Sequence, residues 1–434
     1  MIIHMNYGKS GLDVNLHDSW DVTVIRKKKM PILSDPVSAL QNSMQNPVGS
    51  PPFNELIKGK KTVCIAICDI TRPVPNSIIL PTLMDNILKA GIDKNSITIL
   101  VATGLHSPTE GEALEEVIGN KEILNSIKIY NHYARNEKDH IFLGKTQNNV
   151  PVKIDRRFIQ ADLRLVVGLV EPHFMAGYSG GRKLIAPGIA HEDTIRSIHA
   201  PILLEKPGVD NCIIDNNPLH HTLVEIAYMV GECYGVNTVI DEERKISFVN
   251  FGEIIKSHFE AVAYARPFVE VEVEKRYPVI ITSAAGYPLD KNYYQTVKGM
   301  IAPLGIIEPG GQLFIVSQCS EGIGSPDFCL SQQKLHKMGI DGFKNAIHGK
   351  TYAQIDEWET EMLVKAMKVC HISLYSTGIT EKDRLLTGIR VIDDIDKELK
   401  DCLHRLQDKR IAVIPEGPYV IPIYKGSLHR ADNC

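Results

Sequence analysis

The chain has 434 residues, of which 44% are apolar and 23% charged, as in an ordinary globular protein with room for two or three domains. A net charge of −4 without a long Lys/Arg run excludes nucleic acid as the main partner. No apolar run approaches the roughly 20 residues that span a bilayer, a signal-peptide core is missing, and the nine cysteines form no CxxC motif, so we expect a cytoplasmic protein without membrane contact.

The first half of the chain predicts an α/β domain. A β-rich opening ends in a Pro/Gly linker near Pro51. Continuous apolar runs, typical of buried parallel strands, lie at 61–70, 96–104 and 161–170. Helical spacing predicts helices at 76–91, 109–119 and 220–235. The stretch 237–252 predicts a hairpin that turns at 241–244, and a helix follows it.

The charged, alternating stretch 269–278 predicts a link, after which the pattern starts again. We expect strands at 279–286, 311–320, 370–378 and 410–418, and helices at 295–304 and 357–368. The fold class is therefore α/β, with two domains at 1–270 and 275–434, largely parallel sheets and an active site in the cleft between them. We expect the last residues to pack back on the first domain.

Polar side chains follow the three predicted strands of the first domain at the points where the strands end. Asp69 and Arg72 follow the first strand, His106 the second and His173 the third. Open parallel sheets bind ligands outside the carboxyl ends of their strands. Any one of these residues could be an ordinary exposed loop side chain. The convergence of a carboxylate, a guanidinium and two imidazoles favours a functional site.

A glycine-rich segment follows the third strand. Ser179, Gly180 and Gly181 precede Arg182 and Lys183, and such a turn lets backbone N–H groups approach a phosphate. A tight structural turn is an equally good interpretation, because neither a Walker A loop nor a GxGxxG motif is present. Lys183 could pair with an anion or, once desolvated, act as a nucleophile.

Two further patterns carry chemistry-bearing side chains. His191 and His199 are possible metal ligands, but their separation of eight residues is not that of a standard zinc pair. In the second domain, Gln295 and Lys298 share one helical face beside Tyr294, which suits either a ligand-covering helix or a solvated first turn.

At these residues the chain resembles the nickel-pincer nucleotide-dependent lactate racemase family. The matching stretches include "DITRP" (69–73), "ATGLHSPTEGE" (102–112), "GLVEPHFMAGYSGGRKLIAPG" (168–188), "TIRSIHAP" (194–201), "YYQTVKGM" (293–300), "CSEGIGSP" (319–326) and "DEWETEML" (356–363). They occur in both predicted domains, so the resemblance covers most of the chain.

The resemblance implies a cofactor and a set of roles. The cofactor is a pyridinium-3,5-bisthiocarboxylic acid mononucleotide that holds nickel through a ring carbon and two sulfurs. Lys183 matches the lysine that attaches it covalently, and His199 matches the histidine that binds nickel. His106 and His173 match the paired catalytic histidines. The other matching positions are Arg72 and Lys298 as cations near the substrate, Asp69, Gln295, Tyr294 and Trp358 as pocket residues, and the Ser179–Gly181 turn facing the cofactor phosphate.

The implied reaction is racemisation or 2-epimerisation of a small α-hydroxy acid by removal and return of a hydride. Proton transfer must take place on both faces of a planar 2-oxo acid, and this requires two bases. Cofactor-synthesis proteins are implied partners. Arg182 stands where lactate-type members have a small residue, and we expect it to meet a second anionic group of the substrate or the phosphate. The alternatives are a metal-dependent lyase or dehydrogenase of a polyhydroxy acid, and a non-catalytic nickel-cofactor carrier.

Overall fold

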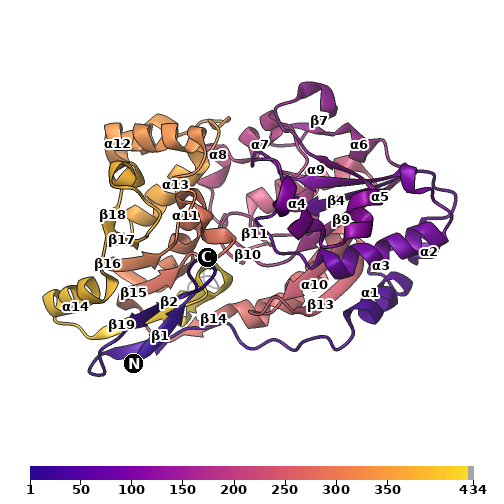
Figure 1. Cartoon of the computed structure of the whole chain (residues 1–434). Helices are drawn as coiled ribbons and strands as arrows, with labels where there is room; N and C mark the ends of the chain where they lie inside the picture. Colours follow the sequence, from indigo (N-terminus) through magenta and orange to yellow (C-terminus); the bar gives the residue numbers. More distant parts are fainter. Residues whose placement is uncertain (429–434) are drawn as a thin grey trace.

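The computed structural model describes residues 1–428, which form two domains, each built on a six-stranded sheet (Figure 1). The first sheet has the order β13-β12-β9-β4-β5-β6. Its strands are β4 Val63–Cys68, β5 Ile97–Ala102, β6 Lys128–Asn131, β9 Leu163–Leu169, β12 Tyr234–Ile240 and β13 Ile246–Glu253. All neighbours are parallel except the β12–β13 hairpin. The three predicted strands and the hairpin are therefore confirmed, and the three strands are adjacent.

Helices cover this sheet because the central strands are apolar on both faces. β4 is buried along its whole length, and β9 is buried except at Arg164. The helices of this domain are α1 Pro36–Gln45, α2 Phe53–Leu56, α3 Asn76–Lys89, α4 Gly111–Ile118, α5 Lys121–Ser126, α6 Arg156–Ile159, α7 Glu192–Ile198, α8 Pro201–Leu204, α9 Pro218–Val230 and α10 Ile254–Val269. Two small hairpin strand pairs also belong to this domain: β7 His140–Lys145 with β8 Pro151–Asp155, and β10 Pro172–His173 with β11 Gly177–Tyr178. A third pair, β1 Ile2–Met5 with β2 Leu12–Asn15, packs on the sheet of the second domain.

The second sheet is parallel throughout and has the order β18-β17-β16-β15-β19-β3. Its strands are β3 Asp21–Val24, β15 Tyr277–Ser283, β16 Ile307–Val316, β17 His371–Tyr375, β18 Arg390–Ile392 and β19 Arg410–Ile414. Its helices are α11 Tyr293–Ile301, α12 Pro326–Ile347, α13 Glu357–Met367, α14 Ile395–Leu406 and α15 Lys425–Leu428. The four strands and two helices predicted here are present.

The N-terminal segment differs from the expected division at 1–270. β3 pairs with β19, so residues 21–24 extend the second sheet rather than the first. The chain then crosses to the first domain and returns through β14 Glu270–Val273, which pairs with β20 Ile421–Tyr424. The end of the described chain thus lies against the link between the domains, while residues 429–434 lie outside the described part. Within residues 1–428, no helix is both long and apolar enough to cross a membrane.

Candidate active site

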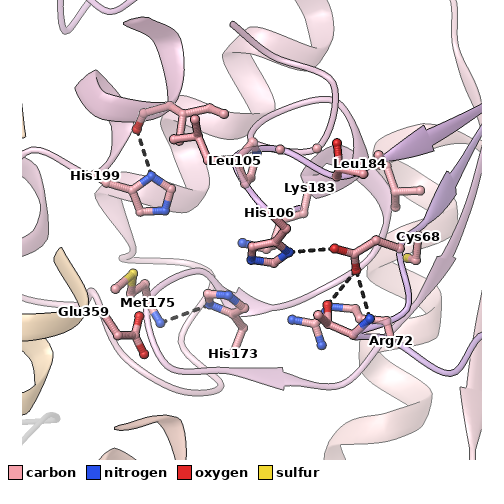
Figure 2. Close-up of a pocket in the computed structure, with 18 of the residues that line it drawn as sticks. Cys68, Arg72, Leu105, His106, His173, Met175, Lys183, Leu184, His199 and Glu359 are labelled. Atoms are coloured by element: carbon pink, nitrogen blue, oxygen red, sulfur yellow. Dashed lines mark hydrogen bonds and ion pairs between the residues drawn. The ribbon is translucent and has the colours of Figure 1, made fainter. Parts of the chain in front are cut away.

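The carboxyl ends of β4, β5 and β9 open into a cavity of about 140 Å³ between the two domains. Figure 2 shows side chains of both domains directed into it. The predicted residues that line this cavity are Asp69, Arg72, His106, His173, Gly180, Lys183, His199, Tyr294, Lys298 and Trp358. The expectation that the strand ends converge is therefore correct at the level of geometry.

His106 is held by a carboxylate. Its Nδ1 lies 2.6 Å from Oδ2 of Asp69, whose other oxygen accepts hydrogen bonds from the backbone N–H and the hydroxyl of Thr71. Burial alone would raise the pKa of Asp69, but His106 and the Thr71 hydrogen bonds outweigh it and hold the pKa below its ordinary value. An ionised Asp69 accepts the Nδ1–H of His106, which leaves the Nε2 lone pair of His106 free to take a proton.

The ring hydrogen of His173 is on the other nitrogen from that of His106. The backbone N–H groups of Met175 and Ala176 both donate to its Nδ1 at 3.2 Å. Burial, and then the basic side chains around it, lower the pKa of His173 well below its ordinary value, so the ring is neutral. A neutral imidazole that accepts at Nδ1 carries its hydrogen on Nε2. The cavity thus contains one imidazole with a free Nε2 and one with an Nε2–H.

Lys183 and His199 line the same cavity in the first domain. Lys183 lies in the single turn Gly181–Leu184, and its Nζ has no hydrogen-bond partner within residues 1–428. Burial, followed by the nearby charge of Arg72, lowers its pKa well below the ordinary value, which favours the uncharged, nucleophilic form of the amine. His199 ends α7, and its Nδ1–H donates to the carbonyl of Ile195 at 2.8 Å. Its Nε2 therefore offers a lone pair, as a metal ligand must.

Two cations stand beside the imidazoles. Arg72 forms an ion pair with Glu171, and the ammonium of Lys298 donates to Oε1 of Gln295. Burial and the charge of Arg72 lower the pKa of Lys298 to about 8. Gln295 does not line the cavity itself but holds the lysine that does. Trp358 packs on the His199 ring at 4.6 Å and donates its indole N–H to the Tyr294 hydroxyl.

The structure corrects the expectation for Arg182. This side chain is wholly buried and donates to the carbonyls of Tyr178 and Ala176 at 3.1 and 2.9 Å, beside His258. It points away from the cavity, so it meets neither a substrate anion nor a phosphate there. The Ser179 hydroxyl likewise donates to the carbonyl of Leu169. Both side chains stabilise the turn because the neighbouring carbonyls need donors.

Of the turn glycines, Gly180 lines the cavity and Gly181 does not. Gly180 has φ of +79°, and a Cβ there would lie 2.8 Å from Cγ2 of Val170. Only glycine fits this position. The backbone, rather than any side chain, is what the turn presents to the cavity.

His191 belongs to a different group of residues. Its Nε2 lies 2.9 Å from Glu137, and its Nδ1 lies 3.4 Å from Asp193. A cation could sit among these three side chains. The ammonium of Lys153 already lies 2.9 Å from both carboxylates, and the hydroxyl of Tyr352 donates to Asp193 from the second domain. We interpret the group as an ion-pair network at the contact between the domains.

Sequence reasoning missed two carboxyl groups that line the cavity, those of Asp356 and Glu359. They lie three positions apart at the start of α13, on either side of Trp358. Both are more than nine-tenths buried. Buried carboxyls cannot be told from exposed ones by helical spacing alone, although the i, i+3 spacing placed them on one face.

The whole chain can be compared with known proteins. Residues 7–210 match the lactate racemase N-terminal domain, and residues 273–422 match the lactate racemase C-terminal domain. The lactate racemase of Thermoanaerobacterium thermosaccharolyticum is 30% identical over 425 residues, which is 96% of this chain and 98% of that protein. The chain belongs to the lactate racemase family. This is a family of racemases, which are isomerases.

Other members and structures agree with this assignment. The lactate racemase of Lactiplantibacillus plantarum is 30% identical over 389 residues, covering 88% of this chain and 90% of that protein. The solved structure of the lactate racemase apoprotein from T. thermosaccharolyticum superposes with a TM-score of 0.88 at 29% identity, over 97% of this chain and all of that one. A Thermotoga maritima protein with a TM-score of 0.68 and 16% identity, over 86% of this chain and 96% of that one, shares the fold.

Proposed function

We propose that this protein inverts the configuration at C2 of an α-hydroxy acid, as a racemase or a 2-epimerase. The observation that carries the proposal is the pair His106 and His173, two imidazoles in one cavity. The Nε2 of His106 carries no hydrogen, whereas the Nε2 of His173 does. The lactate racemases that the chain resembles support it. Lactate is then the simplest substrate to test.

His106 is suited to remove a proton from the C2 hydroxyl. Its free Nε2 accepts the proton, and the imidazolium that results is stabilised by the Asp69 carboxylate on Nδ1. Loss of this proton makes the C2–H bond easier to break as hydride, because the developing carbonyl delocalises the oxygen's electrons. Asp69 also prevents the ring from turning its hydrogen toward the substrate.

His173 is suited to act on the opposite face of the substrate, provided that its ring hydrogen changes position. As it stands, its Nε2–H can donate a hydrogen bond to a substrate oxygen. To remove a proton from the opposite enantiomer, the ring must carry its hydrogen on Nδ1 instead of Nε2, and Nδ1 must then release the N–H groups of Met175 and Ala176. We therefore expect the segment 174–176 to shift between the two directions of the reaction.

Arg72 and Lys298 would hold the substrate carboxylate. Both line the cavity, and two cations can fix a carboxylate so that only the hydrogen and the hydroxyl change places. The ion pair with Glu171 keeps the guanidinium of Arg72 in place before the substrate arrives. Positioning of this kind contributes to rate because the 2-oxo acid must return in a different orientation without leaving.

The residues fit the nickel-pincer nucleotide that the family resemblance implies. Lys183 offers an amine without a hydrogen-bond partner among the described residues, and burial lowers its pKa toward the uncharged form that a covalent thioamide link requires; His199 offers an oriented lone pair for nickel. Gly180 lines the cavity, so its backbone would face the phosphate of the nucleotide at this turn. When bound, this group supplies the acceptor and donor for the C2 hydrogen. His106 and His173 then carry only protons.

The test is purification after co-expression with cofactor-synthesis proteins, followed by chiral chromatography of a panel of α-hydroxy acids. We expect inversion at C2, nickel in the protein and a mass increment on Lys183. His106→Ala and His173→Ala should each abolish inversion while nickel is retained. A nickel-loaded protein that inverts no acid would point to a carrier, and a product other than the C2 epimer would point to a lyase or dehydrogenase; either result would refute the proposal.

A further inference from the structure

One wall of the cavity carries a carboxyl that the proposed proton transfers do not use. Glu359 lies on α13 of the second domain, lines the cavity and is only 1% exposed. Figure 2 shows its carboxyl group extending from α13 toward His173 and Met175. Its Oε1 receives no hydrogen bond from any residue in 1–428. A buried acceptor without a donor is destabilising, so its presence in a cavity calls for a ligand that supplies one.

The neighbouring groups do not supply that donor. Lys298 donates to Gln295. The Tyr294 hydroxyl receives the Trp358 N–H and bonds the Asp356 carboxyl group, which also receives the Ser325 hydroxyl. Burial raises the pKa of Glu359 to about 8, with Lys298 opposing and Asp356 adding to this rise. Near neutral pH the carboxyl can thus both accept and donate a hydrogen bond without a full charge.

This chemistry distinguishes among α-hydroxy acids. The methyl group of lactate offers no donor and would leave Oε1 of Glu359 unpaired. A hydroxyl group on the carbon beyond C2 can donate to Oε1 and accept from the protonated form.

Resting on the proposed inversion at C2, we propose that the preferred substrate is an α-hydroxy acid with at least one further hydroxyl group on its carbon chain, and that Glu359 selects it by hydrogen bonding to that hydroxyl. The site discriminates because an acid without the hydroxyl leaves a buried polar atom unpaired. Sites built to bond a substrate hydroxyl reject analogues that lack it by about 10⁴-fold or more, and more weakly where water can enter.

The sharpest comparison is glycerate against lactate, because these acids differ by one oxygen atom. With cofactor-loaded enzyme we expect kcat/KM to favour glycerate by about 100-fold or more, and four- to six-carbon polyhydroxy acids to be inverted as well. Racemisation of 2-hydroxybutyrate controls for size. In Glu359→Leu the glycerate-to-lactate ratio should fall by about 100-fold, while the isosteric Glu359→Gln, which keeps an amide oxygen, should lose less.

Glu361 provides the matched control. It lies on the same helix, its two carboxylate oxygens are buried without partners, and burial raises its pKa to about 8, but it does not line the cavity. Glu361→Leu should leave the glycerate-to-lactate ratio at the wild-type value. An equal fall of the ratio in both variants would overturn the assignment to Glu359.

A binding measurement separates this inference from the proposed function. The shift in Tm that each acid produces on the cofactor-free protein should be larger for glycerate than for lactate, and Glu359→Leu but not Glu361→Leu should remove the difference. If loaded enzyme inverts lactate as well as glycerate and Glu359→Leu leaves their ratio unchanged, the inference is wrong while the proposed function stands. If no acid is inverted, the proposed function fails, and equal Tm shifts for the two acids would overturn the inference as well.

Discussion

At the scale of single residues, the hydrogen positions on two imidazoles decide what the cavity can do. Asp69 fixes the hydrogen of His106 on Nδ1, whereas two backbone N–H groups fix the hydrogen of His173 on Nε2. Identical side chains thus start in different roles, because one faces a carboxylate and the other faces donors. Sequence spacing cannot show this difference, since it depends on which atoms the fold brings to each ring.

The role of Asp69 can be tested with Asp69→Asn. Asparagine keeps the volume of the side chain, but its NH₂ group favours the opposite hydrogen placement on His106 and cannot stabilise an imidazolium. We expect kcat to fall by about four orders of magnitude, as when an orienting carboxylate is lost elsewhere. Nickel content and Tm, measured on the same preparation, should stay near wild type. Turnover near the wild-type value would show that the Asp69–His106 contact is not used.

At the scale of elements, α7 of the first domain docks on the segment that leads into α13 of the second. Tyr352 donates to Asp193 at 2.6 Å, and the guanidinium of Arg196 lies 4.0 Å from the Tyr352 ring. Arg196 also donates to the carbonyl of Ala353 at 2.8 Å. Because α7 ends at His199 and α13 begins beside Trp358, this contact sets how the two walls of the cavity meet.

Tyr352→Ala should loosen this contact, because it removes a hydrogen bond and a cation–π contact worth about 1–2 kcal/mol together. Because about 1.4 kcal/mol corresponds to a tenfold change in affinity, we expect KM to rise by roughly tenfold, with a smaller change in kcat. Tyr352→Phe keeps the ring under Arg196, so its KM should lie between that of Tyr352→Ala and that of wild type. Steady-state kinetics with the best substrate of the panel would measure the order, and equal KM values in all three proteins would exclude the role.

Some of the helices and strands could be predicted from the sequence, and others could not. Continuous apolar runs identified β4, β5 and β9, and their ends located the cavity, because both features depend on local composition. Helix α12 was missed, since Gly339 interrupts it at φ of +69° and its residues are largely polar. The direction of Arg182 and the pairing of β3 depend on contacts distant in sequence, which periodicity does not report.

At the scale of the whole molecule, the two domains are joined by more than one stretch of chain. β3 belongs to the second sheet, α1 to the first domain, and the chain returns through β14. Two crossings allow the domains less relative motion than a single linker would. We therefore expect any opening of the cavity, whose walls come from both domains, to be a bend about these two stretches of chain.

Buried histidines should make the stability of the whole protein depend on mild acid. Burial, then the charge of Arg182, lowers the pKa of His220 to about 2, and His220 is 2% exposed on α9. Its folded pKa lies below the unfolded value of about 6.5, so the unfolded chain binds protons first. The stabilisation by neutral His220 is complete above pH 6.5 and is lost as the pH falls, by about 2 kcal/mol between pH 7 and pH 5.

Urea unfolding of wild type and His220→Asn at pH 7 and pH 5 tests whether acid lowers the stability of the protein through His220. Asparagine destabilises the protein at both pH values by leaving space on α9, but it does not titrate. The free energy of unfolding should therefore fall by about 2 kcal/mol less in the variant than in wild type over this interval. Glu361 acts in the opposite direction, because burial raises its pKa to about 8 and acid restores its neutral form. The comparison between the two proteins cancels that contribution, so equal falls in wild type and variant would show that His220 is not held neutral.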